Sequence, residues 1–109
     1  MTSSKPSASK RATPPRASDY SKPFRRDWER LTHSDRFDMR QLKAVMLLLI
    51  ANDGPLGAEW QDHPLTGEWS AHRECHVGGD FLLIYRIDGK TPNEIVAFVR
   101  AGTHADLFE

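Results

Sequence analysis

Three histidines and one aspartate in the second half of the chain have side chains that suit proton transfer. They are His63, His76, Asp80 and His104. Imidazole is the side chain best suited to give and take protons near neutral pH, and a carboxylate can share that task. If these four side chains converge on one cleft, that cleft is a candidate for acid–base catalysis.

The length and composition limit what the chain can be. At 109 residues it has the size of one domain with a modest core. Its longest apolar run, residues 44–51, has eight residues, whereas a membrane helix needs about 20. The positive N-terminus has no apolar stretch behind it, so no secretory signal is predicted. Cys75 is the only cysteine, which excludes an internal disulfide and is typical of a cytoplasmic protein.

Residues 1–18 are rich in Ser, Pro, Ala and basic residues and offer little to bury, which predicts a disordered basic tail before a folded domain at 19–109. The tail is either an extension without a role or a basic arm that contacts phosphates. Residues 1–20 carry a charge of +3 and the remainder −3, so the net charge is zero. RNA binding by the folded part would therefore need local clustering of arginine.

Apolar spacing predicts two helices, at 24–31 and 35–52, and a stop at 52–55 where Gly54 takes the left-handed cap. Residues 53–71 are predicted to be a loop, with Trp60 and Trp69 pinning it to the core. Strands are predicted at 73–77, 80–87 and 94–100, and a weakly signalled strand at 17–22. The expected fold is α+β, with two N-terminal helices packed on one face of a small antiparallel sheet.

The turn between the first two main strands decides whether His76 and Asp80 meet. If Val77 pairs with Asp80 across Gly78 and Gly79, His76 and Asp80 point to opposite faces of the sheet. They converge only if the turn is wider or twisted. A metal trio of His72, Cys75 and His76 is not expected, because His72 and His76 would lie about 13 Å apart along one strand.

Four segments resemble, in order and at similar spacing, the YafQ-like toxins of the RelE/ParE superfamily. They are residues 62–69, residues 73–77, Asp80 with residues 83–85, and residues 100–108. The resemblance spans about residues 20–109 and implies a RelE-like fold. It also implies a type II toxin that cuts mRNA in the ribosomal A site without a metal or other cofactor. Its partners would be the ribosome, mRNA and a cognate antitoxin, often a ribbon-helix-helix protein that binds DNA.

Carried over position by position, the family's catalytic set falls on His63, His76, Asp80 and His104, with Phe108 beside it. Metal-free RNA cleavage needs a base for the ribose 2′-OH and an acid for the leaving 5′ oxygen. His63 or Asp80 suits the base, His104 suits the acid, and His76 could orient the phosphate or share a proton.

Three further side chains are candidates for RNA binding. Arg73 and Arg100 could neutralise phosphate charge, because guanidinium matches phosphate in bidentate fashion. Phe108 could stack on an unstacked base, or it could plug the core at the C-terminus.

Two other functions use the same fold. One is a toxin of the ParE type that acts on DNA gyrase, which the histidine set argues against. The other is a catalytically inert module that only binds the antitoxin, which the zero net charge mildly favours. Growth arrest with mRNA cleavage distinguishes the leading hypothesis from both.

Overall fold

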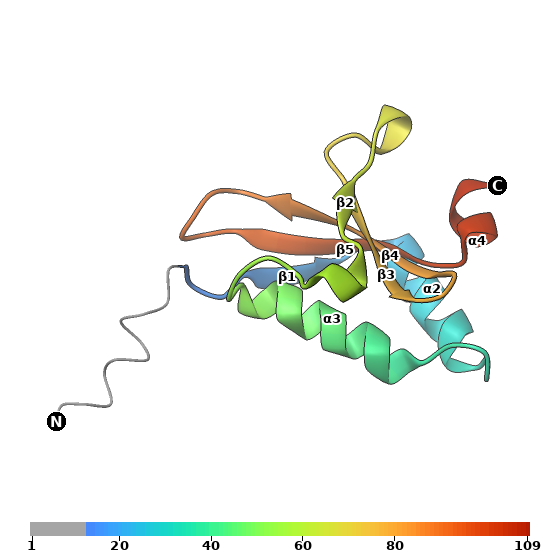
Figure 1. Cartoon of the computed structure of the whole chain (residues 1–109). Helices are drawn as coiled ribbons and strands as arrows, with labels where there is room; N and C mark the ends of the chain where they lie inside the picture. Colours follow the sequence, from blue (N-terminus) through green and yellow to red (C-terminus); the bar gives the residue numbers. More distant parts are fainter. Residues whose placement is uncertain (1–12) are drawn as a thin grey trace, which may run out of the picture.

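The computed structural model describes residues 13–109. Within these residues the chain forms five strands, three helices and two short 3₁₀ turns (Figure 1). In order they are β1 (Ala17–Tyr20), α2 (Lys22–Thr32), α3 (Met39–Ala51), η1 (Ala58–Trp60), β2 (His63–Pro64), η2 (Gly67–Trp69), β3 (Arg73–Gly78), β4 (Phe81–Asp88), β5 (Ile95–Gly102) and α4 (His104–Phe108). None of the helices within residues 13–109 is long and apolar enough to cross a bilayer.

The strands form one sheet in the order β1-β5-β4-β3-β2. β3, β4 and β5 form the expected antiparallel meander. Two edge strands flank it: β2, which lies within the predicted loop 53–71, pairs antiparallel with β3, and β1 runs parallel to β5. The weakly signalled N-terminal strand therefore exists, and it makes the sheet mixed rather than purely antiparallel. The predicted α+β class is confirmed.

Helices α2 and α3 cover one face of the sheet (Figure 1). The main core lies between these helices and the sheet. It includes Phe24, Leu31, Leu42, Val45, Leu83 and Phe98, all at most 2% exposed. A second, smaller cluster of Leu82, Ile84 and Leu107 contains the alternate residues of β4 and a residue of α4. Because side chains alternate along a strand, the second cluster lies on the face opposite the main core.

The predicted second helix is correct in its body but not at its ends. It begins at Met39 rather than Asp35, because the Asp38 carboxylate accepts hydrogen bonds from the amides of Arg40 and Gln41 and so caps it. At the other end Asn52, not Gly54, adopts the left-handed conformation, with φ 58°. Asparagine tolerates this region, and its side-chain amide donates to the carbonyl of Pro14 at 3.0 Å.

The boundary of the predicted tail also needs correction. The hydroxyl of Thr13 donates to the Asn52 carbonyl, and the amide of Arg16 donates to the Ile50 carbonyl. The Arg16 guanidinium pairs with Glu94 at 2.8 Å and donates to the Leu49 carbonyl at 2.7 Å. Residues 13–18 thus belong to the folded part, and the rest of the predicted tail, 1–12, lies outside the described residues.

Candidate active site

The face of the sheet away from α2 and α3 holds a cluster of polar side chains from β2 and β3. His63 on β2 pairs in register with Glu74 on β3, and His63 Nε2 lies 3.3 Å from Glu74 Oε1. His76, two residues further along β3, places its Nε2 3.9 Å from the same oxygen. The rings of His63 and His76 are 6.0 Å apart between centroids. The structure therefore brings two predicted catalytic histidines together around one carboxylate.

A register shift in the hairpin explains why His76 reaches this face. Gly78 pairs with Phe81 and His76 with Leu82, with an irregularity between them. His76 therefore shares a face with Leu82 of the second cluster, while Cys75 and Val77 point into the main core. The tighter pairing of Val77 with Asp80 considered from the sequence does not occur.

Glu74 is the functional candidate that sequence reasoning missed. It is 6% exposed, and its Oε2 is buried without a hydrogen-bond partner among the described residues. A buried carboxylate oxygen without a partner is costly, so its presence beside two histidines suggests a chemical role. The signal was present in the sequence, because Glu74 and His76 are two apart on a strand and must share a face.

The environment of His63 determines which of its nitrogens carries hydrogen. Its Nδ1 lies 2.9 Å from the carbonyl oxygen of Gln61, which can only accept, so Nδ1 must donate. Its Nε2 then faces the Glu74 carboxylate. A proton added to Nε2 creates an imidazolium that is paired at once with a buried negative charge.

His104 reaches the site from a helix that was not expected from the sequence. α4 begins with a capping box in which Thr103 and Asp106 exchange hydrogen bonds. These bonds, led by the one from the Thr103 amide, lower the pKa of Asp106. Asp80, in the β3–β4 turn, accepts a hydrogen bond from the His104 amide at 3.1 Å. Asp80 thus holds the backbone of the residue that sequence analysis assigns as the acid.

One cavity of about 360 Å³ collects most of these groups. It is lined by His63, Leu65, Thr66, Trp69, Glu74, His104 and Phe108. His76 and Asp80 do not line the cavity themselves, but each contacts a residue that does. His76 lies beside Glu74, and Asp80 accepts a hydrogen bond from the amide of His104. The side chain of His104 is 62% exposed, and its ring lies 5.0 Å from that of Phe108. Two imidazoles, a carboxylate and an aromatic ring therefore line one solvent-accessible hollow.

The two predicted phosphate-binding arginines do not line this cavity. Arg73 has the parity of Cys75 and faces the other side of the sheet, where its guanidinium binds Asp62 at 2.9 and 3.1 Å. Tyr85 donates to the same carboxylate. These contacts, chiefly the hydrogen bond that Arg73 donates to Asp62, raise the pKa of Arg73. Because side chains alternate along β3, Arg73 lies on the face opposite Glu74 and His76.

Arg100 is bound to a buried aspartate. Its Nε and one terminal nitrogen donate to Asp27 at 2.7 and 3.0 Å, and these hydrogen bonds to the carboxylate raise the pKa of Arg100. The second terminal nitrogen is not committed to Asp27, so Arg100 keeps donors that an anion can use. Its charge, however, is largely balanced by Asp27.

The histidine cluster also has the composition of a metal site. Ligand atoms of His63, Glu74 and His76 all lie within 4.8 Å of one another. Two imidazoles and a carboxylate are donors that suit zinc or copper. From the sequence no metal site was predicted, and the trio considered there was a different one, His72, Cys75 and His76. In the structure, one member of that trio, Cys75, points into the main core.

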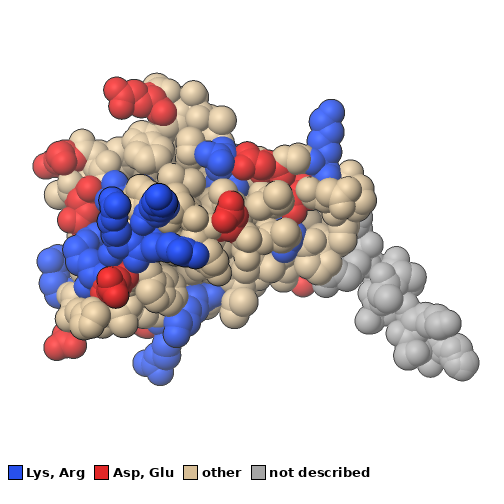
Figure 2. All heavy atoms as spheres, turned by 180° about the vertical axis from the view of Figure 1, so that it is seen from behind, with Lys and Arg blue, Asp and Glu red and all other residues tan. Residues whose placement is uncertain are grey.

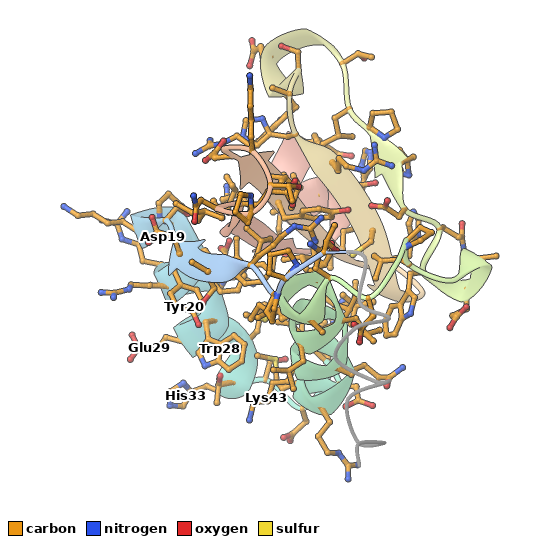
Figure 3. All side chains as sticks on the ribbon, turned by 90° about the vertical axis from the view of Figure 1, so that its left-hand side faces the viewer. Asp19, Tyr20, Trp28, Glu29, His33 and Lys43 are labelled. Carbon is orange, nitrogen blue, oxygen red and sulfur yellow. The ribbon has the colours of Figure 1, made fainter. Side chains whose placement is uncertain are left out.

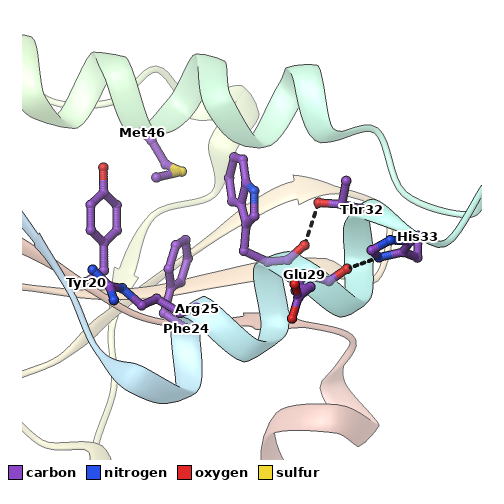
Figure 4. Close-up of a pocket in the computed structure, with 8 residues that line it drawn as sticks. Tyr20, Phe24, Arg25, Glu29, Thr32, His33 and Met46 are labelled. Carbon is purple, nitrogen blue, oxygen red and sulfur yellow. Dashed lines mark hydrogen bonds between the residues drawn. The ribbon is translucent and has the colours of Figure 1, made fainter.

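A larger hollow of about 590 Å³ lies on the opposite side, between α2 and α3 (Figures 3 and 4). Its walls are mainly apolar and aromatic, with Tyr20, Phe24, Trp28 and Met46 among them. His33, on its rim, points its Nδ1 at the carbonyl of Glu29. This groove has no paired acid and base like those around Glu74.

Comparison with known proteins gives a consistent result. Residues 16–109 match the family model of the bacterial toxin of type II toxin–antitoxin systems, YafQ. The mRNA interferase toxin YafQ of Escherichia coli K12 is 42% identical over 90 residues, which cover 83% of this chain and 92% of that protein.

Two solved structures are similar along their whole length. The E. coli DinJ–YafQ complex has 41% identity and a TM-score of 0.74, covering 86% of this chain and 99% of that chain. A metal-bound toxin from Helicobacter pylori has 38% identity and a TM-score of 0.72, covering 84% of this chain and 98% of that chain.

Proposed function

This chain belongs to the YafQ family of bacterial type II toxins, and we propose that it is an endoribonuclease that cleaves mRNA on the ribosome. The observation that carries the proposal is the single cavity lined by His63, Glu74, His104 and Phe108. It offers two separately positioned imidazoles, which is what cleavage by internal attack of the ribose 2′-OH requires. An endoribonuclease of this kind inhibits translation in the cytoplasm.

In this mechanism His63 is the base. Its neutral form carries hydrogen on Nδ1, so Nε2 accepts the 2′-OH proton as the 2′ oxygen forms a bond to phosphorus. Glu74, 3.3 Å away, stabilises the positive charge that develops on the ring. The second candidate base, Asp80, is already engaged by the His104 amide and is assigned to positioning.

His104 is the acid that completes the reaction. Its exposed ring gives a proton to the 5′ oxygen as the bond between phosphorus and that oxygen breaks. The products are a 2′,3′-cyclic phosphate and a free 5′-OH, and no other reactant is consumed. We assign His76 and the uncommitted donors of Arg100 to the phosphate oxygens, and Phe108 offers a face to a base.

Docking on the ribosome is supported by the surface of α2. The whole chain has no net charge, yet Lys22, Arg25, Arg26 and Arg30 are all exposed on this helix. Figure 2 shows Lys and Arg side chains gathered over this part of the rear face. Such clustering is what binding to the phosphates of ribosomal RNA needs.

The proposed regulator is a cognate antitoxin, since the similar E. coli toxin YafQ is found in complex with DinJ. A ribbon-helix-helix protein that binds DNA is the expected type. A catalytically inert binding module remains the contrasting hypothesis, and the experiment below separates the two.

The test is induction of the wild type and of His63→Ala and His104→Ala in cells, with growth recorded and mRNA 5′ ends mapped. Each substitution should lower cleavage by about 10²–10⁴-fold, the usual contribution of one proton-transfer group. The matched control is His33→Ala, a histidine on the opposite side of the molecule. Arrest without cleavage by the wild type would indicate another target, and stable expression without arrest would indicate an inert module.

A further inference from the structure

Trp69 forms part of the wall of the catalytic cavity, although it is not among the predicted catalytic or RNA-binding residues. From the sequence, Trp60 and Trp69 were both expected to pin the loop to the core. Trp60 does so, at 8% exposure in the main cluster. Trp69 is only partly buried and packs instead on the second cluster, beside Phe108. The two tryptophans therefore have different roles.

The flap, defined as residues 65–72, is the loop that projects from the sheet between β2 and β3, and it carries Trp69 (Figure 1). Gly67 and Ala71 flank it with φ of 68° and 70°, in the left-handed region. For a residue with a side chain, such as Ala71, this conformation persists only where the surroundings impose it, and it is frequent at functional sites. The amide of Trp69 donates to the Thr66 carbonyl, and its own carbonyl accepts from His72.

The rings around the cavity form a corner. Those of Trp69 and Phe108 meet at 77° with centroids 6.1 Å apart, and the Phe108 ring lies 5.0 Å from that of His104. A flat ring stacked on one face of this corner meets the other wall edge-on, which is also a favourable aromatic geometry. The opening beside the corner is polar, because His63 and Glu74 line the same cavity.

We propose that this aromatic corner, Trp69 with Phe108, is a nucleobase subsite and that Trp69 determines base preference there. The inference rests on the proposed function. The subsite adjoins His104, which protonates the 5′ oxygen of the nucleotide after the cleaved bond. The base it binds is therefore that of the nucleotide on the 3′ side. Purines offer the larger π face, so a purine is preferred at that position.

The test compares Trp69→Phe with Trp69→Leu in the full-length chain. The substrates are short mRNAs on purified ribosomes that differ only in the base after the cleavage site. Phenylalanine keeps an aromatic face, so we expect cleavage within about threefold of wild type. Leucine keeps apolar bulk but removes stacking, so kcat/KM should fall by about 10-fold or more and the purine preference should flatten. Trp28→Leu, in the groove between α2 and α3, is the matched control and should cleave like the wild type.

Equal rates and equal base preference for the phenylalanine and leucine variants would overturn the proposal. A second measurement decides the case if Trp69→Leu does not fold. The indole N–H signal of Trp69 in ¹⁵N-labelled wild type is followed while a 2′-O-methyl trinucleotide, which cannot be cleaved, is added. A shift of that signal, larger for a purine, supports the subsite, and no shift overturns it. Because this titration needs no turnover, it is independent of whether the wild type cleaves mRNA.

Discussion

At the scale of single residues, the site depends on where β2 meets β3. The resemblance located His63, His76 and His104, because each lies in a recognisable motif. It did not single out Glu74, which in the sequence is one of several charged residues on a strand. Strand alternation places Glu74 on the same face as His76, but only the pairing of β2 with β3 shows that the carboxylate also faces His63. Register between strands distant in sequence is a tertiary property that local patterns do not contain.

Glu74→Gln tests this assignment. We expect cleavage to fall by about 10²-fold, because the charge that forms on His63 is no longer balanced. We expect the melting temperature to stay the same or rise, because a neutral amide costs less to bury than a carboxylate with an unpartnered oxygen. Steady-state cleavage and thermal unfolding give the two readouts, and Glu29→Gln on the exposed side of α2 is the control. Unchanged cleavage, or a melting temperature that falls by many degrees, would argue for a structural carboxylate.

At the scale of elements, α2 follows β1 along the edge of β5 and contacts the part of β5 that β1 does not reach. β1 ends at Tyr20, so β5 loses its parallel neighbour from Val99 onward. Beyond that point, side chains of α2 and its N-cap make hydrogen bonds to the backbone of β5. The hydroxyl of Ser21, the N-cap, donates to the Val99 carbonyl at 2.6 Å, and Asp27 accepts from the Ala101 amide at 3.0 Å. The part of β5 that extends beyond β1 is therefore covered by α2 and its N-cap.

Asp27→Asn should destabilise the fold by about 2–3 kcal/mol. Asp27 is 4% exposed and binds Arg100 through both oxygens, so its loss leaves a partly buried guanidinium without a balancing charge. Arg30→Ala removes a weaker, half-exposed contact to the same carboxylate and should cost less than about 1 kcal/mol. Urea unfolding of the two variants measures the difference. Equal costs would show that Asp27 is not the main tether between α2 and β5.

The elements differ in how well the sequence foretold them. The bodies of α2 and α3 were predicted correctly because apolar periodicity directly reflects the face that packs on the sheet. α4 was not, since five residues are too few to show a period. The left-handed cap of α3 was predicted at Gly54 because glycine adopts positive φ most readily. In the structure it is Asn52, whose side-chain amide donates to the carbonyl of Pro14 in the N-terminal segment.

At the scale of the whole molecule, the sheet separates the side that packs on α2 and α3 from the side that holds the proposed site. On the helix-packed side, the side chains of Cys75 and Tyr85 are buried. Burial, and secondarily Asp62 and Glu74, raise the pKa of the Cys75 thiol to about 12. Burial and the hydrogen bond with Asp62 raise the pKa of Tyr85 as well. Both groups therefore stay protonated in the folded protein well above the pH at which the unfolded chain loses these protons.

This predicts a stability that declines in alkaline solution. Between pH 9 and about 12 the unfolded chain binds fewer protons at Cys75 than the native one, so the free energy of unfolding falls as pH rises. One such group contributes at most about 1.4 kcal/mol per pH unit. Urea unfolding at pH 8 to 11 should show a steeper decline for the wild type than for Cys75→Ala. Parallel declines for the two proteins would contradict the assignment.

The alternation along β3 has a consequence for how this protein can evolve. Cys75 and Val77 lie in the core, while Glu74 and His76, their immediate neighbours, lie at the proposed catalytic site. Neighbouring positions of β3 are thus under separate constraints: the core positions are constrained by folding, and the positions on the other face by the proposed reaction. A lineage that loses toxicity through Glu74 or His76 would keep its shape. Inactive descendants that still fold are therefore a single substitution away.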